Sequence, residues 1–144
     1  MNQRPTIRPF DWPDHDPVIA LWQACGLVVP PNNPQKAIER KMKWQPDLFL
    51  VAESAGEILG TVMAGYEGHR GWINYMAVAP ASQKIGIGRQ LMLAAEEKLR
   101  ALGCAKINLQ IRKTNAQVMQ FYERLGFTED HDISMGKRLI DDPQ

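Results

Sequence analysis

The sequence predicts one α+β domain, residues 1–144, built around a mixed and mostly antiparallel sheet. Three observations lead to this prediction. Short β-like runs alternate with turn residues, and other stretches carry apolar residues at the helical spacing of three and four. One helical stretch also joins two strands as a βαβ unit, which makes those strands parallel. With 144 residues, 44% of them hydrophobic, the chain is long enough for a single core. The predicted order is β α α β β β α β α β β.

The first half of the chain gives a strand, two helices and three more strands. Residues 6–10 are β-like, and a helix is predicted over residues 17–25. Asn33 and Pro34 form a cap and first turn for a second helix, which reaches about Lys43. Turns at "SAGE" and "EGHRG" then separate three strands, at residues 48–53, 58–66 and 72–78.

After Pro80 the spacing of the apolar residues changes from that of a strand to that of a helix. A helix from Gly88 carries a stripe of leucine, methionine and alanine, and Gly103 stands where its C-cap would be. "KINLQIR", residues 106–112, alternates as a strand does. A further helix begins at Asn115 and is ended by Gly126, and residues 127–130 and 133–139 are predicted to be two final strands.

Composition narrows the classes of partner. A net charge of +1 argues against a nucleic-acid partner. Because no apolar run approaches about 18 residues, no membrane partner is expected. The N-terminus carries Arg4 and Arg8 and no apolar run, so it is not a signal peptide. Cys25 and Cys104 form no CxxC and no metal spacing occurs, which predicts a cytoplasmic location and no metal.

The most specific stretch is "SQKIGIGRQLM", residues 82–92, which lies between the end of a strand and the start of a helix. Free N–H groups and the helix dipole make such a place an anion site, and glycine lets a phosphate approach the backbone. A dinucleotide fingerprint would need glycine at Leu91, and no GxxxxGK is present. A plain flexible connection and an unrelated nucleotide-binding domain remain alternatives.

Two motifs together resemble the GCN5-related N-acetyltransferase (GNAT) family. The first, "YMAVAPASQKIGIGRQLM", contains the Q/R-x-x-G-x-G/A pattern of that family after a strand. The second, "NAQVMQFYERLGF", starts at Asn115 and contains Tyr122. "GYEGHRG", "IERKM" and "GKRLI" are further similar to a bacterial subgroup, the YpeA-type acetyltransferases. The resemblance implies the GNAT fold and acetyl-CoA as cosubstrate.

The resemblance also implies roles for individual residues. Backbone N–H groups of the glycine loop would hold the CoA pyrophosphate, and the strand before the loop would run beside the pantetheine arm. An N–H near Met76 or Ala77 would bind the thioester oxygen. Tyr122 would be the general acid that protonates the departing thiolate, with plain core packing as the alternative. The implied cofactor-binding residues are Met76, Ala77, Val78, Gln83, Lys84, Ile85, Gly86, Ile87, Gly88, Arg89, Asn115 and Tyr122.

The sequence offers no clear general base. Some family members carry a glutamate where this chain has Gln110, and glutamine cannot take a proton. Glu67, His69 and His131 are weaker candidates. Glu67 and His69 lie in the "YEGHRG" turn, where solvation explains them better than a base acting through water, and His131 lies near the end of its predicted strand. Without a base, an acceptor amine of low pKa, such as an α-amino group, or a base acting through water, is expected.

The leading hypothesis is therefore an enzyme that moves an acetyl group from acetyl-CoA to a primary amine by direct attack in a ternary complex. A non-catalytic acyl-CoA sensor is the alternative. The expected acceptor is a small-molecule amine or a protein N-terminal amine, and a homodimer is possible. The resemblance places the acceptor near the first helices and the hairpin turns, where the aromatic candidates are Trp22, Trp44, Tyr66 and Trp72.

Overall fold

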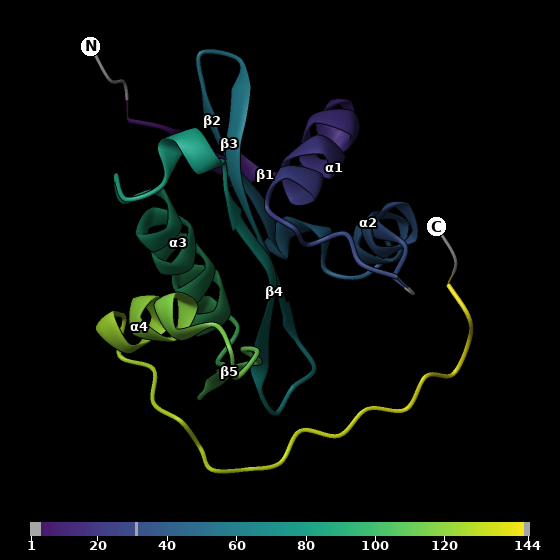
Figure 1. The fold of residues 1–144 in the computed structure, drawn as a ribbon, viewed down its shortest axis with the longest axis vertical. Helices are drawn as coiled ribbons and strands as arrows, with labels where there is room; N and C mark the ends of the chain where they lie inside the picture. The colour runs from purple at the N-terminus through teal and green to yellow at the C-terminus, as the bar shows by residue number, and fades with distance from the viewer. Residues whose placement is uncertain (1–3, 31, 143–144) are drawn as a thin grey trace.

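The computed structural model describes residues 4–30 and 32–142, and its core is a five-stranded sheet in the order β1-β2-β3-β4-β5 (Figure 1). The first four strands pair in antiparallel fashion, and β5 joins β4 in parallel. The mixed, mostly antiparallel sheet with one parallel βαβ unit is thus confirmed. The strands are β1 Thr6–Pro9, β2 Phe49–Ser54, β3 Glu57–Tyr66, β4 Gly71–Val78 and β5 Ile107–Leu109.

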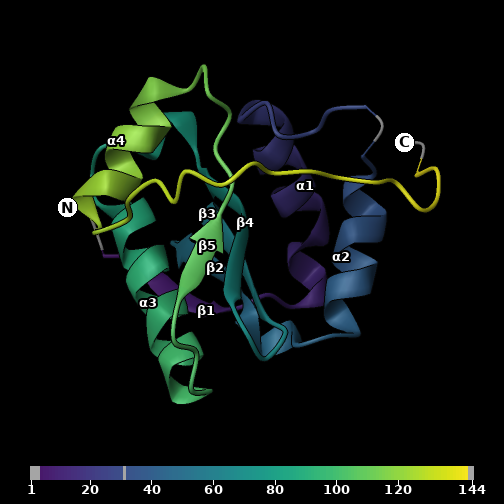
Figure 2. The same ribbon diagram turned by 90° about the horizontal axis from the view of Figure 1, so that it is seen from below.

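Helices cover both faces of the sheet (Figure 2). On one side lie α1 (His15–Ala24) and α2 (Pro34–Met42), and on the other lie α3 (Ile87–Ala101) and α4 (Ala116–Arg124). The predicted caps of α2 and α4 are present. The Asn33 Oδ1 accepts from the Lys36 N–H at 3.1 Å, and the Asn115 Oδ1 accepts from the Val118 N–H at 3.2 Å.

Each face of the sheet has its own apolar core because side chains alternate along the strands. Leu91, Met92 and Leu99 of α3 are fully buried against one face, as their helical spacing predicts. Trp22 of α1 and Ile38 of α2 are fully buried against the other. The sheet is therefore sandwiched between two helical layers, and only its ends are open.

The chain after α4 contradicts the sequence prediction. Residues 127–130 and 133–139 form no strand in the part of the chain that is described. Residues 127–142, called the strap below, instead run extended from α4 across the end of the sheet to α2 (Figure 2). The physical reason is that, within the described residues, the strap is held by side chains and not by a backbone ladder: Asp130 pairs with Lys106 at 2.9 Å, and Asp142 pairs with Arg40 of α2 at 2.6 Å.

The strand at residues 106–112 is also shorter than its alternation predicts. Only Ile107–Leu109 forms β5, and Gln110 and Arg112 lie beyond it. The strand ends because β4, its partner among the described residues, turns away after Ile73.

Candidate active site

The two parallel strands separate halfway along β4. Their register contains only Gly71 with Ile107, Trp72 with Asn108, and Ile73 with Leu109. On its other side β4 stays paired with β3 as far as Val78. Within the described residues, the β5-facing edge of β4 beyond Ile73 therefore has no ladder partner, so its N–H and C=O groups line an opening in the sheet.

A β-bulge lies where β4 leaves β5. In the β3–β4 register Thr61 pairs with Ala77 and Met63 with Asn74, so two residues of β4 oppose one residue of β3. Tyr75, one of the two, has a left-handed φ of +49°. Bulges of this kind bend a strand and increase its twist, which accounts for the direction that β4 takes.

A buried hydrogen-bonded relay holds this bulge. The Trp22 Nε1–H donates to the Thr61 hydroxyl at 2.9 Å, and that hydroxyl donates to the Tyr75 carbonyl at 2.8 Å. The rings of Trp22 and Tyr75 also stack, with centroids 3.9 Å apart. Both Trp22 and Thr61 are fully buried. The relay therefore connects α1 and β3 to the backbone of the bulge.

The glycine loop adjoins the open end of β4. Lys84 and Gly86 both have left-handed φ values, +69° and +92°, and α3 begins at the next residue, Ile87. Gly86 is the N-cap and supplies no side-chain bond. The first i→i−4 bond of α3 joins the Gln90 N–H to the carbonyl of the N-cap Gly86, at 3.0 Å. The N–H groups before it are the orphan donors of a helix N-terminus, which suit an anion.

Glycine is required at positions 86 and 88 for two different structural reasons. A Cβ on Gly86 would meet nothing within 4 Å, so this glycine is needed for its φ and leaves the loop surface open. A Cβ on Gly88 would lie 3.0 Å from the Phe121 ring, so this glycine lets α3 and α4 pack closely. Only Gly86 faces open space, where a phosphate could approach.

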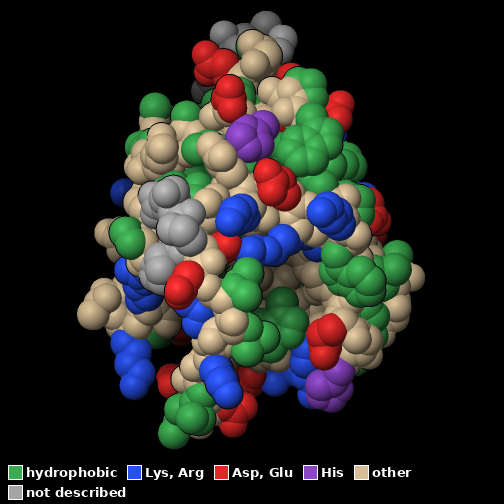
Figure 3. All heavy atoms as spheres, turned by 90° about the vertical axis from the view of Figure 1, so that its right-hand side faces the viewer, with side chains coloured by type: hydrophobic (Ala, Val, Ile, Leu, Met, Phe, Trp, Pro, Cys, Tyr) green, Lys and Arg blue, Asp and Glu red, His purple; other side chains and the backbone are tan. Residues whose placement is uncertain are grey.

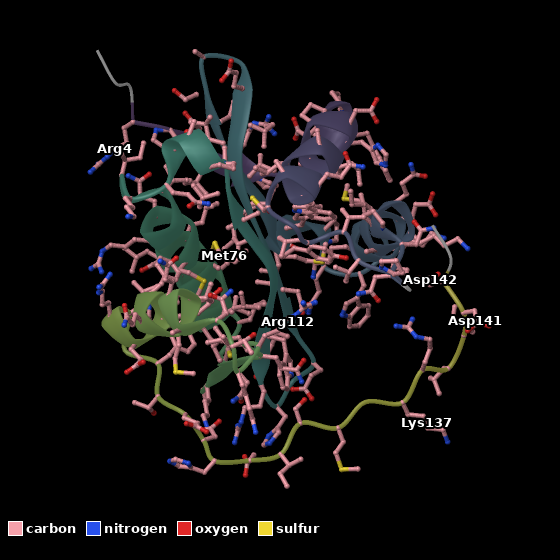
Figure 4. All side chains as sticks on the ribbon, in the orientation of Figure 1. Arg4, Met76, Arg112, Lys137, Asp141 and Asp142 are labelled. Carbon is pink, nitrogen blue, oxygen red and sulfur yellow. The ribbon has the colours of Figure 1, made fainter. Side chains whose placement is uncertain are left out.

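The other predicted cofactor-binding residues lie along β4, on the loop after it, at the start of α3 and at the cap of α4. Lys84, Ile85 and Arg89 are exposed on the loop, whereas Ile87 is buried beneath it. The Gln83 amide folds back and donates to the Val78 carbonyl at 3.1 Å. Ala77 is buried, and Met76 and Val78 pack partly against the α3-side core; Figure 4 labels Met76 in its place between α3 and β4. Asn115 is exposed and is engaged as the α4 cap.

Tyr122 projects from α4 into the α3-side core. Its ring is 6% exposed and packs edge-on against Phe121 and Phe127. Desolvation by burial raises the pKa of Tyr122 to about 12, so its hydroxyl is protonated at neutral pH. No partner for that hydroxyl is found among the described residues, in which every fully buried side-chain polar atom is hydrogen-bonded. The hydroxyl therefore faces accessible space.

The base candidates are occupied elsewhere or exposed. The Glu67 carboxylate accepts the N–H groups of His69 and Arg70 within its own turn, which lowers its pKa. His131 is exposed on the strap. Gln110 is exposed and donates to the Ser134 hydroxyl. Among the described residues, the hydrogen bonds and ion pairs of these side chains are thus with their own turn or with the strap and not with residues 75–77.

The aromatic acceptor candidates divide in two. Trp22 is fully buried in the relay and cannot touch an acceptor directly, so that prediction is wrong because its helical face points into the core. Trp44 and Trp72 are 66% and 39% exposed. The Tyr66 hydroxyl donates to the Gly68 carbonyl at 3.0 Å within the hairpin turn.

Within residues 4–30 and 32–142, no three His, Cys, Asp or Glu side chains gather as metal ligands do. None of the helices in these residues has the length and apolar character of a membrane span.

Together, an α+β sandwich, a parallel pair that separates and a glycine loop at a helix N-terminus define the acyl-CoA-dependent acetyltransferase class of fold. The profile of the acetyltransferase (GNAT) family matches residues 15–127, and the chain belongs to that family. The family implies acyl transfer from acetyl-CoA.

Individual relatives agree with this assignment. The chain is 47% identical over 139 residues to acetyltransferase SG1711 of Sodalis glossinidius (strain morsitans), covering 96% of this chain and 98% of the relative. The structure resembles Naa20 of Chaetomium thermophilum, solved with a bisubstrate analogue, with 26% identity, a TM-score of 0.67 and coverage of 83% and 69%. It shares its fold with AAC(6')-Iy, solved with a bisubstrate analogue of CoA, at 16% identity, a TM-score of 0.76 and coverage of 96% and 100%.

Proposed function

We propose that residues 1–144 act as one cytoplasmic domain that transfers an acetyl group from acetyl-CoA to a primary amine by direct attack in a ternary complex. The observation that carries the proposal is the separation of β4 from β5 after Ile73, next to the open loop at Gly86. Membership of the GNAT family supports it independently. Both cysteines are free thiols, which suits a reducing compartment.

In this proposal the chain holds acetyl-CoA by its backbone. The N–H groups of residues 84–89 bind the pyrophosphate at the positive end of α3, where the left-handed Gly86 keeps the surface clear. The unpaired edge of Met76, Ala77 and Val78 runs beside the pantetheine arm. The bulge presents an N–H of Met76 or Ala77 to the thioester oxygen, and such donors stabilise the charge that develops there.

Tyr122 is the proposed general acid. With a pKa of about 12 for the phenol and about 8.5 for a thiol, proton transfer to the thiolate is uphill by roughly 5 kcal/mol. A barrier of that size still permits about 10⁹ events per second, far above ordinary turnover. The raised pKa therefore weakens Tyr122 as an acid without making proton transfer rate-limiting.

The acceptor is proposed to be an amine that needs little help in losing its proton. At pH 7 a lysine-like amine is neutral in about one molecule in 2,500, which costs about 4.6 kcal/mol, whereas an α-amine costs little over 1 kcal/mol. Since the Glu67 carboxylate is bonded within its own turn and the Gln110 amide cannot take a proton, an α-amine on a small molecule or a protein N-terminus is favoured. Turnover of a dipeptide α-amine and of a matched ε-amine tests this, and faster acetylation of the ε-amine would contradict it.

A non-catalytic acyl-CoA sensor is the second candidate, favoured by the missing base. Thiol release from acetyl-CoA in the presence of an amine library separates the two functions. The enzyme releases CoA in proportion to acetylated amine. A chain that binds acetyl-CoA but releases no thiol with any amine is a sensor.

A further inference from the structure

Lys41 stands at a position of α2 where an apolar side chain is the usual occupant. Pro34, Ile38 and Lys41 follow one another at spacings of four and three, so they lie on one face of the helix. That face packs on the sheet, and Ile38 is fully buried there. Lys41 is only 8% exposed. A lysine is seldom buried to this extent unless its ammonium group is paired.

The Lys41 ammonium group has no bonded partner among the described residues. Desolvation by burial lowers the pKa of Lys41, and the Asp47 carboxylate opposes this only through space. Every fully buried side-chain polar atom in the described chain is hydrogen-bonded, so the unbonded Lys41 Nζ must reach accessible space. Lys41 therefore holds a largely desolvated charge at the border of a space that a ligand can enter.

The sheet leaves room beside this ammonium group. The Lys41 Nζ lies over Gly65 of β3, where an added Cβ would be 3.6 Å from it. A side chain at this position would therefore cover the charge. Gly65 pairs with Trp72 of β4, and paired residues of an antiparallel ladder point to the same side. Trp72 and Lys41 thus lie on the same face of the sheet.

A row of side chains on β4 leads from Lys41 to the bulge. Trp72 is 39% exposed, and Asn74, which shares its face, is also exposed. Tyr75 follows at the bulge and packs with the core of that face. Trp72, Asn74 and Tyr75 are called the acceptor strip below. At about 3.3 Å per residue the strip spans about 10 Å, with the Lys41 charge at one end and the bulge at the other.

The surroundings of Lys41 carry an excess of positive charge. A hollow of about 560 Å³ beside α2 is lined by the cations Arg40, Lys137 and Arg138 and by one carboxylate, that of Asp142. Figure 3 faces the side of the molecule on which α2 and the end of the strap lie, and Lys and Arg side chains gather there above a hollow. A concave surface with charges of one sign raises the local concentration of oppositely charged ligands.

We propose that Lys41 binds a carboxylate of the acceptor and thereby selects anionic amines. This inference rests on the proposed function, because it takes the acceptor amine to react at the bulge. The carboxylate pairs with the Lys41 Nζ at one end of the acceptor strip, and the amine meets the thioester at the other. The bound carboxylate supplies the charge-assisted bond that the buried ammonium group lacks in the chain itself.

The length of the acceptor strip sets the length of the acceptor. An extended peptide spans about 3.3–3.6 Å per residue, so the α-amine and the terminal carboxylate of a tripeptide lie about 10 Å apart. The substrate class is therefore a peptide-sized amine that carries a carboxylate about 10 Å from its nitrogen. Shorter and longer anionic amines cannot reach both ends of the strip in an extended form.

Acetylation of matched peptides by the unaltered chain tests the proposal. Tri-alanine with a free carboxylate is expected to have a kcat/KM at least about tenfold above that of tri-alanine amide, as a charge-assisted hydrogen bond provides. Di-alanine and penta-alanine, with carboxylates at about 7 and 17 Å from the amine, should show a smaller preference for the acid. Equal kcat/KM for tri-alanine and its amide overturns the proposal.

Three variants assign the preference to the ammonium group. Lys41→Met keeps the length of the side chain and is expected to bring tri-alanine down to the level of its amide. Lys43→Met, at an exposed lysine of the same helix end, is the matched control and keeps the preference. Gly65→Ala leaves the charge but places a methyl group 3.6 Å from it, so the preference should fall in part. A preference that survives Lys41→Met overturns the proposal.

Calorimetry with CoA present separates this inference from the proposed function. N-acetyl-tri-alanine, the reaction product, is expected to bind the unaltered chain at least about tenfold more tightly than its amide, and Lys41→Met should bind the two alike. That result in a chain that acetylates neither peptide supports the role of Lys41 and overturns the proposed function. Acetylation of both peptides without a difference in binding supports the proposed function and overturns the role of Lys41. Binding of neither peptide overturns it too.

Discussion

Replacing Thr61 by valine is expected to destabilise the protein far more than replacing it by serine. Valine has the shape of threonine but lacks the hydroxyl that joins Trp22 to Tyr75. The buried Trp22 N–H and the half-buried Tyr75 carbonyl then lose their partner. Each unpaired group costs about 1–3 kcal/mol, so the free energy of unfolding should fall by about 2–6 kcal/mol. Serine keeps both bonds and loses one methyl group, at a cost of about 1 kcal/mol.

Urea denaturation of the two variants measures this difference, and a double-mutant cycle with Trp22→Phe assigns it. In the Trp22→Phe background Thr61→Val leaves only the Tyr75 carbonyl unpaired, so its effect should shrink by about 1–3 kcal/mol. Because the relay holds the bulge, Thr61→Val is also expected to lower kcat more than Thr61→Ser does. Surface substitutions usually change the free energy of unfolding by no more than about 0.5 kcal/mol. If the valine and serine variants differed by less than that, the relay would have no role in stability.

Three other changes have defined outcomes. Tyr122→Phe should slow turnover at least tenfold and leave acetyl-CoA affinity unchanged in calorimetry; wild-type turnover would refute the acid role. Burial raises the pKa of Tyr122 to about 12 from an ordinary value near 10. Between these two pH values the phenol loses its proton in the unfolded state but keeps it in the folded state, so the free energy of unfolding is unaffected below pH 10 and falls from pH 10 to 12. Alkaline denaturation should show that loss, about 2–3 kcal/mol, in the wild type and not in Tyr122→Phe. Gly88→Ala should cost about 1–3 kcal/mol in thermal unfolding, because its Cβ would lie 3.0 Å from Phe121, and Phe121→Leu should relieve it; equal costs in both backgrounds would show that no clash exists.

Local signals in the sequence predicted most of the helices and strands. The caps at Asn33 and Asn115 are side-chain bonds within one turn, so they can be read without knowing the fold. The burial of Leu91, Met92 and Leu99 on α3 is likewise predictable from local sequence. Their spacing places them on one face of the helix, and that face can pack against a sheet whatever the topology of the sheet.

What the sequence could not predict depends on contacts between distant residues. "KINLQIR" alternates to residue 112, but the strand ends where β4 departs, and the bulge that directs β4 depends on Thr61. No motif marks this threonine; the one clue is a hydroxyl within an otherwise apolar run. The loop motif groups Gly88 with Gly86 as part of a phosphate loop, whereas a Cβ at Gly88 would lie 3.0 Å from the Phe121 ring, a contact that the motif does not predict. Apolar and polar residues alternate in the strap as they do in a strand. A strand also needs a hydrogen-bonded neighbour, however, and the sequence pattern does not show whether one is present.

The central claim is that backbone amides at residues 84–89 bind the diphosphate of CoA and thereby place the thioester at the bulge of β4. Calorimetric titration with acetyl-CoA, CoA and acetyl-pantetheine, which lacks the diphosphate, tests it most directly. The account predicts one site per chain for the first two ligands and at least tenfold weaker binding of the third. Equal affinity for all three, or no binding of either CoA form, would contradict it.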